Sequence, residues 1–217
     1  MILQAAESVG FYGIGSIRDS INSSRPKVRV GILLLQRNRD FYKALAAAFE
    51  QVATATQGHE VLLQIDFLEE LSPQNVSDCL VRLAQRNDVI GVVAPEHPTI
   101  SATIEKLAEN GKKFFGLVSP LTARCGVGYV GLDNYKVGRT VGWLFHNYCR
   151  NDAAKIGILV GNHRFRCQDI NESGFRSYFR EHATNLTLLE PQSTFENSNI
   201  AREVTEVNRQ KSRSTKA

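Results

Sequence analysis

The stretch YVGLDNYKVGRTVGWLFHNYC, residues 129–149, continued by RNDAAKIGILVGNHRFRCQDINESGFRSYF, residues 150–179, decides the fold. Ile156–Val160 is a short apolar run closed by Gly161, which is typical of a buried strand. A helix is predicted on either side of this strand, because apolar residues recur there at helical spacing. They are Val137, Val141, Leu144, Phe145 and Tyr148 before the strand, and Ile170, Gly174 and Tyr178 after it. Asp133 stands where the first helix should begin and is a predicted N-cap. The stretch therefore predicts strand, helix, strand, polar loop and helix.

Towards the N-terminus the same alternation of strands and helices repeats. The predicted strands are Val28–Leu35, Glu60–Phe67, Val89–Ala94, Phe114–Ser119 and Tyr129–Leu132. Asp40 is the predicted cap of a helix ending at Gly58, Ser72 and Pro73 start a second helix, and Thr99–Asn110 is a third. Strands that alternate with helices of this length indicate an α/β fold with a parallel, doubly wound sheet.

After Asn151 the pattern starts afresh and predicts a second lobe. Its elements are the strand 156–160, a helix near Gln168–Ala183, a strand Leu186–Leu189 and a helix Asn197–Asn208. Two strands make a thin sheet with unpaired edges, so this lobe is expected to be incomplete. The predicted domains are residues 28–150 as the first lobe, 151–207 as a partial second lobe and 208–217 as a basic tail.

Composition narrows the class of protein. The 217 residues are 42% apolar and 22% charged, with a net charge of +4, which is ordinary for a globular protein. The apolar runs have the length of strands, so no membrane partner is predicted. The N-terminal residues 1–10 do not resemble a secretory signal. Four widely spaced cysteines favour a reducing, cytoplasmic location.

Two motifs suggest a dinucleotide site and a zinc site, but neither has the structural context that such a site requires. Residues 126–131 read GVGYVG, but a dinucleotide fingerprint must follow a strand and open a helix, whereas these glycines run through a strand. His146, Cys149, His163 and Cys167 would be a four-ligand zinc set, but spacing alone does not bring them together. No nucleophile elbow, HExxH or P-loop occurs. We therefore predict no enzyme, no cofactor and no metal.

Polar residues follow the predicted strands and indicate a ligand-binding cleft. They are the segments Arg37–Phe41, Pro95–His97, Asp133–Asn134 and Asn162–Arg164. Ligands of open α/β sheets bind outside the carboxyl ends of the strands. Carboxylates, amides and an aromatic ring suit a polyhydroxylated ligand. For Asp40 and Asp133 helix capping is an equally good interpretation, and the two roles are compatible.

The segment V-x-x-DN-x-x-x-G, the strand KIGILVG and the segment GFRxxF together resemble the sugar-binding core of the lactose-repressor family. That resemblance implies a two-lobed fold of the type I periplasmic binding proteins. It implies that Asp133 contacts the sugar, and it puts Asn171 where the family has an arginine that grips the ligand. Arg166 is the predicted substitute, Phe41 falls among the residues lining the cleft, and Arg39 makes an acidic or phosphorylated sugar worth testing.

The resemblance also extends to the first 27 residues, which look like a remnant of a DNA-binding headpiece and hinge. Ile21 stands in place of the leucine that wedges into the minor groove, and Ile17 belongs to the same hinge segment. The prediction is a truncated sugar-responsive transcriptional regulator, with an operator DNA and a homodimer partner in the intact protein. Because no helix-turn-helix precedes Gly10, this chain alone is not expected to repress. The alternative is the solute-binding receptor of a sugar transporter.

Overall fold

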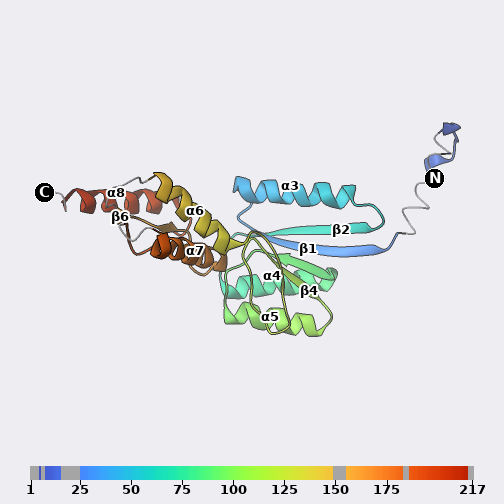
Figure 1. Cartoon of the computed structure of the whole chain (residues 1–217). Helices are drawn as coiled ribbons and strands as arrows, with labels where there is room; N and C mark the ends of the chain where they lie inside the picture. Colours follow the sequence, from blue (N-terminus) through green and yellow to red (C-terminus); the bar gives the residue numbers. More distant parts are fainter. Residues whose placement is uncertain (1–4, 6–7, 16–24, 149–154, 183–185, 215–217) are drawn as a thin grey trace. The chain divides into compact units, whose positions relative to one another are not determined.

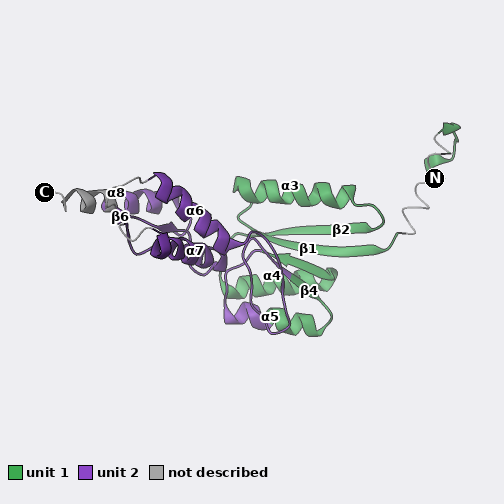
Figure 2. Ribbon diagram, in the orientation of Figure 1, with its two compact units in different colours: residues 1–92, 103–114 green, residues 93–102, 115–217 purple. Residues whose placement is uncertain are grey.

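The structure is a computed structural model that describes residues 5, 8–15, 25–148, 155–182 and 186–214. It divides into two compact units, shown in two colours in Figure 2. Unit 1 comprises Met1–Val92 and Thr103–Phe114, and unit 2 comprises Val93–Ala102 and Phe115–Ala217. The domain boundary predicted at residue 150 stays a prediction, although the helix that precedes it belongs to unit 2.

A five-stranded sheet has the order β2-β1-β3-β4-β5. Its strands are β1 (Lys27–Leu35), β2 (Glu60–Leu68), β3 (Val89–Val92), β4 (Lys113–Leu117) and β5 (Gly128–Val130). β1 pairs in parallel with β2 on one side and with β3 on the other. The side chains of residues 32–35 are almost fully buried, as a strand covered on both faces requires. The predicted α/β fold with a parallel sheet is confirmed.

Helices lie on both faces of this sheet. Figure 1 shows α3 (Asp40–Ala55) along one face of β1 and β2, and α4 (Pro73–Arg86) on the opposite face; α5 (Pro98–Glu109) follows β3. The α4 prediction is confirmed in detail, because the Ser72 hydroxyl accepts from the backbone N–H of Asn75 at 3.3 Å and Pro73 is the first helical residue.

The helix α3 corrects two expectations. Asp40 is its first residue and not its cap, since the N-cap is Arg39 and no side chain caps this end. Helical spacing in the sequence predicts that an apolar stripe faces the core, made of Phe41, Leu45, Ala48, Phe49 and Val52. Phe41 and Val52 are exposed instead, and Tyr42 is the buried residue of the helix. The periodicity predicted the helix, but its buried face is centred on Tyr42, with Leu45 and Phe49 half-buried on the same side.

Unit 2 contains the second run of elements, drawn in yellow to red in Figure 1. They are α6 (Asn134–Tyr148), β6 (Lys155–Ile156), β7 (Leu159–Val160), α7 (Arg166–His182), β8 (Thr187–Leu188), β9 (Gln192–Ser193) and α8 (Ser198–Ser214). The single strand predicted over 156–160 is wrong, because two short strands replace it: β6 pairs with β8, and β7 with β9. A small core of Ile156, Phe175, Phe179 and Leu186 packs beneath α7.

Two glycines allow α6 and α7 to approach very closely. A Cβ on Gly138 would lie 1.9 Å from the backbone oxygen of Asn171, and a Cβ on Gly174 would lie 2.2 Å from that of Tyr135. Atoms cannot approach that closely, so only glycine fits at either position. These are the glycines of the DN-x-x-x-G and GFRxxF segments. The two motifs therefore mark the two sides of one helix crossing.

The crossing also corrects the face predicted for α6. The buried residues of this helix are Asn134, Gly138 and Gly142. Most of the predicted apolar stripe is exposed instead: Val141, Leu144, Phe145 and Tyr148. Small residues face α7 because close packing of two backbones excludes larger side chains. Among the described residues, no helix is long and apolar enough to cross a membrane.

Candidate functional site

Three loops of unit 2 meet at Arg166, the first residue of α7. Its Nη1 donates to the hydroxyl of Thr122, in the loop after β4, and lies 3.5 Å from a carboxylate oxygen of Glu96, in the loop after β3. The backbone N–H of Glu96 donates to the carbonyl of Arg164 at 2.8 Å, which ties the first loop to the loop after β7. All three loops leave the carboxyl ends of strands, where ligands of α/β folds bind.

The Arg166 side chain is available to a ligand. It is 46% exposed, and the Glu96 side chain is 34% exposed. A guanidinium has five donors in a planar fork, and the contacts with Glu96 and Thr122 both use Nη1. The geometry therefore offers a charged donor beside a hydroxyl and a carboxylate acceptor, a mixed set that matches vicinal hydroxyl groups.

The loop after β4 is held rigidly around this cluster. The Ser101 hydroxyl donates to the carbonyl of Thr122 at 2.8 Å, and the backbone N–H of Cys167 donates to the buried Ser119 hydroxyl at 3.2 Å. Burial raises the pKa of the Cys167 thiol, so the thiol form is favoured over the thiolate. Cys167 thus acts as a packed residue that fixes the start of α7.

Asp133 occupies the N-terminus of α6, and its predicted capping role is confirmed. One carboxylate oxygen accepts from the backbone N–H of Lys136 at 3.1 Å, and the other lies 3.3 Å from the Lys136 ammonium. Its pKa is lowered, first by that backbone hydrogen bond. Beside it, the Tyr129 hydroxyl accepts from Asn134 at 2.9 Å and donates to the Leu132 carbonyl, and burial raises the pKa of Tyr129.

Two of the other predicted site residues, Arg39 and Phe41, belong to unit 1. In unit 1, Arg39 donates from Nε to the side-chain oxygen of Gln36 at 2.7 Å, and Phe41 is 57% exposed with its ring edge-on to Tyr42. The hinge residues Ile17 and Ile21 lie outside the described residues. The ligand-binding roles predicted for Arg39, Phe41, Asp133, Arg166 and Asn171 all stay predictions.

Asn171 lies apart from Arg166, against a largely apolar cavity of about 500 Å³ within unit 2. The walls come from α6, residues 156–161 and α7, with Glu196 from the turn before α8. The side-chain oxygen of Asn171 is buried and has no hydrogen-bond partner, while its backbone oxygen faces Gly138 across the helix crossing. The structure thus brings Asn171 to the helix crossing, and Arg166 to the loop cluster.

A family model described as "Periplasmic binding protein domain" matches residues 30–215. The chain belongs to this family. The match spans residues of both units. No protein in the curated set matches the chain.

Solved structures of sugar-binding proteins have the same fold as the periplasmic binding protein domain described here. A solute-binding protein from Burkholderia graminis, in complex with D-arabinose, is 15% identical with a TM-score of 0.72, over 83% of this chain and 61% of that one. The fructose-binding periplasmic domain of a hybrid two-component system is 16% identical with a TM-score of 0.72, over 84% and 60%. An Actinobacillus succinogenes protein with bound D-allose is 16% identical with a TM-score of 0.67, over 82% and 63%.

These likenesses, at 15–16% identity, show the fold alone. The chain spans less than two thirds of the length of each of these proteins.

The sequence predicts Glu96 as a residue at the end of a strand, but it does not predict Thr122 or Ser119 as site residues. Both follow β4 within five residues of Leu117, the last residue of the strand, so their position after a strand was the available signal.

Proposed function

We propose that this chain is the sugar-binding part of a solute receptor with the type I periplasmic-binding-protein fold, and that it binds without catalysis. The observation that carries the proposal is the exposed Arg166 guanidinium, placed beside Thr122 and Glu96 where three loops leave the ends of strands. The family match over residues 30–215 supports binding as the task of such loops.

A sugar is the ligand class that this chemistry favours. Hydroxyl groups of a sugar both donate and accept, so they are best matched by carboxylates and charged donors side by side. The solved structures in complex with D-arabinose and D-allose support the same class. Arg166 extends the candidate ligands to sugar acids and phosphorylated sugars, because a guanidinium binds carboxylate and phosphate groups in two-pronged fashion.

The second candidate function is the effector domain of a lactose-repressor-type regulator, a cytoplasmic protein. It is favoured by Asp133 and Asn134 at the start of α6 and by Gly138 one turn later, the arrangement of the V-x-x-DN-x-x-x-G segment. The receptor has the stronger support, because the similar solved structures include several transporter receptors and a sensor domain. Operator binding that a sugar releases would favour the regulator instead.

Calorimetry of the full chain against aldopentoses, hexoses, sugar acids and sugar phosphates tests the binding proposal. Arg166→Ala should weaken the best ligand by about 1–3 kcal/mol, because it removes a charge-assisted hydrogen bond. Arg180→Ala is the matched control, since Arg180 is an exposed arginine near the other end of α7. Unchanged affinity in Arg166→Ala, or an equal loss in Arg180→Ala, would remove Arg166 from the site.

Asp133 needs a variant that separates capping from ligand binding. Asp133→Ala removes both the cap of α6 and the carboxylate, whereas Asp133→Ser retains a good capping hydroxyl. If Asp133 contacts the sugar, both variants should weaken binding by about 1–3 kcal/mol. Normal sugar affinity in Asp133→Ser, with a loss only in Asp133→Ala, would assign Asp133 to the helix alone.

Homodimerisation is proposed by analogy with the regulator family. Its support in the sequence is three apolar residues at and just beyond the end of β2: Phe67, Leu68 and Leu71. Leu68 is only 1% exposed and belongs to the core, and Phe67 lies under the guanidinium of Arg37 at 4.5 Å. Sedimentation of the chain that gives only monomer at high concentration would contradict the dimer.

A further inference from the structure

Three side chains at the start of α7 bring together the donor types that bind metal ions. They are His163, in the loop after β7, and Asp169 and Glu172, one turn apart on α7. One ligand atom of each lies within 4.8 Å of those of the other two. Across the described part of the chain, this is the one group of three or more His, Cys, Asp or Glu side chains with that spacing.

The loop that carries His163 is held against α7 by backbone hydrogen bonds. The N–H groups of Gly161 and Asn162 donate to the side-chain oxygen of Gln168 at 2.5 and 2.9 Å. The N–H of Phe165 donates to the carbonyl of Asn162 at 3.0 Å and closes a tight turn. The backbone of His163 is therefore positioned beside the first turns of α7 before any ligand arrives.

The donor atoms already stand near the spacing that a metal ion imposes. Nδ1 of His163 and Oδ1 of Asp169 are 2.9 Å apart. With metal–ligand bonds near 2.1 Å, two ligand atoms of a tetrahedral site lie about 3.4 Å apart. The His163 and Asp169 side chains are 40% and 57% exposed, so small rotations can open this pair around an ion that enters from solvent.

The third ligand is oriented by a neighbouring arginine. The Glu172 side chain is 13% exposed, and Arg176 donates from Nε to Oε1 of its carboxylate at 2.6 Å. Arg176 is itself anchored by a hydrogen bond to the carbonyl of Leu189 at 2.9 Å. Partners of this kind fix the orientation of ligands in metal sites. The arrangement supplies one rigid and two adjustable ligands.

We propose that His163, Asp169 and Glu172 bind a divalent transition-metal ion, with Zn²⁺ as the preferred ion and water completing the coordination. A neutral imidazole with two carboxylates is a donor set that zinc accepts, whereas Ca²⁺ and Mg²⁺ prefer oxygen ligands throughout. The Asp169 carboxylate contributes a negative charge to the ion, whereas the charge of Glu172 is shared with Arg176. The site differs from the four-ligand set His146, Cys149, His163 and Cys167 discounted above, and it does not depend on sugar binding.

Equilibrium dialysis of the full chain against Zn²⁺ tests the proposal. The measurements use a Cys125→Ser background, because that exposed free thiol binds zinc by itself. His163→Ala and Asp169→Asn remove one ligand each, and both residues are exposed, so the fold is retained. His182→Ala is the matched control: His182 also lies near a carboxylate, with its Nε2 3.5 Å from Glu181 on the same helix, but it lacks a third ligand.

We expect His163→Ala and Asp169→Asn each to weaken the affinity for Zn²⁺ by at least about tenfold, and His182→Ala to leave it unchanged. Saturating Zn²⁺ should also raise the melting temperature of the parent chain but not that of His163→Ala, because an ion that binds only the folded state stabilises it. Equal Zn²⁺ affinity in the parent and His163→Ala, or an equal loss in His182→Ala, would overturn the site.

Discussion

The β1–β3 region, residues 27–92, and the α6–α7 region, residues 134–182, are stabilised in opposite ways. The first has strands of up to nine residues whose aliphatic side chains are buried between helices. The second has strands of two residues and depends on a helix crossing at Gly138 and Gly174. One region is filled by large side chains, and the other requires that side chains be missing. Removing volume should therefore damage the first region, and adding volume the second.

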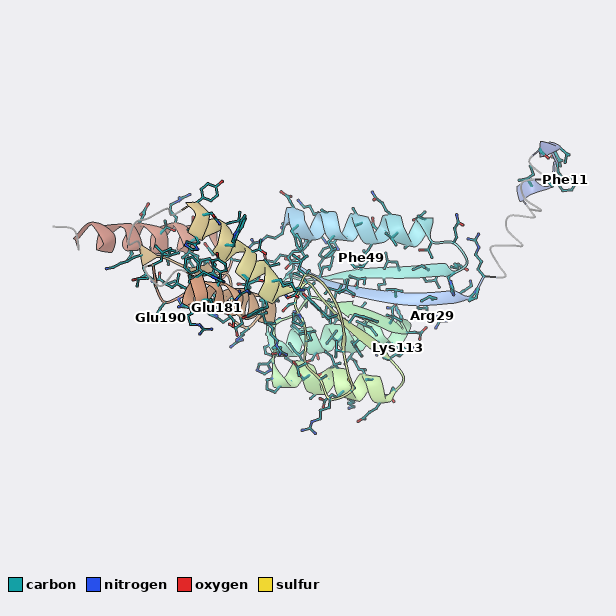
Figure 3. The ribbon with its side chains drawn as sticks, in the orientation of Figure 1. Phe11, Arg29, Phe49, Lys113, Glu181 and Glu190 are labelled. Atoms are coloured by element: carbon teal, nitrogen blue, oxygen red, sulfur yellow. The ribbon has the colours of Figure 1, made fainter. Side chains whose placement is uncertain are left out.

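Polar contacts differ between the two regions as well. Across α6 and α7, Arg139 binds both carboxylate oxygens of Glu181 at 2.8–2.9 Å, and Ser177 donates to the same carboxylate at 2.9 Å (Figure 3 labels Glu181). Tyr135 donates to the Ser177 hydroxyl at 2.8 Å. The crossing thus combines close backbone contact with a network of hydrogen bonds. The β1–β3 region owes its order chiefly to apolar burial.

The largest expected effect comes from removing volume in β1. Leu33→Ala should lower the free energy of unfolding by about 3–5 kcal/mol, because Leu33 is fully buried and leaves a closed cavity. Ile156→Ala is the matched change in unit 2 and should cost less, since Ile156 already borders the cavity of about 500 Å³. Urea denaturation measures both. Equal losses in the free energy of unfolding would contradict the contrast between the β1–β3 region and the α6–α7 region.

Adding one carbon at the helix crossing is the converse test. Gly138→Ala should destabilise the chain by about 3 kcal/mol, because its Cβ would meet a backbone oxygen and α6 must move away from α7. Gly31→Ala in β1 is the control: its Cβ would meet the side-chain amide of Asn87 at 2.9 Å. That amide gives way by lengthening its hydrogen bonds to Gln64 and Leu83, a smaller change than moving one helix backbone away from another. If Gly31→Ala costs as much as Gly138→Ala, the crossing has no special need for glycine.

A smaller loss is expected at the N-terminus of α6. Asp133→Ala should lower the free energy of unfolding by about 1 kcal/mol, because the backbone N–H of Lys136 loses its acceptor. Asp133→Asn keeps an acceptor and should restore most of the stability. If both results are found, the α6–α7 region is stabilised by its N-cap as well as by the helix crossing. A neutral Asp133→Ala would mean that packing against α7 alone orders this helix end.

The smallest effect is a dependence of stability on pH. Arg139 and Ser177 lower the pKa of Glu181 from 4.5 to about 2. Because the folded-state pKa is the lower one, this carboxylate stabilises the fold above pH 4.5, and its contribution is lost as the pH falls towards 2. In Glu181→Gln, the denaturation midpoint should fall less between pH 5 and pH 2 than it does in the parent chain. An unchanged slope in Glu181→Gln would show that the pair adds nothing to stability.

Much of the fold follows from local sequence. Residues 28–35 and 60–67 were predicted as parallel strands because apolar runs of strand length alternate with helical spacing. The caps Ser72 and Asp133 were predicted because an N-cap acts on a backbone N–H only three residues away. Such features need no knowledge of distant residues, and the structure confirms them.

Other features were decided only by tertiary structure. The buried face predicted for α6 was wrong because burial depends on what packs against a helix, and α7 approaches most closely at Gly138, where no side chain is in the way. The site around Arg166 joins residues 70 and 44 positions away, Glu96 and Thr122. The order of elements follows from local periodicity, whereas the loops after β3, β4 and β7 meet only through tertiary contacts, because β7 pairs with β9 in a separate sheet.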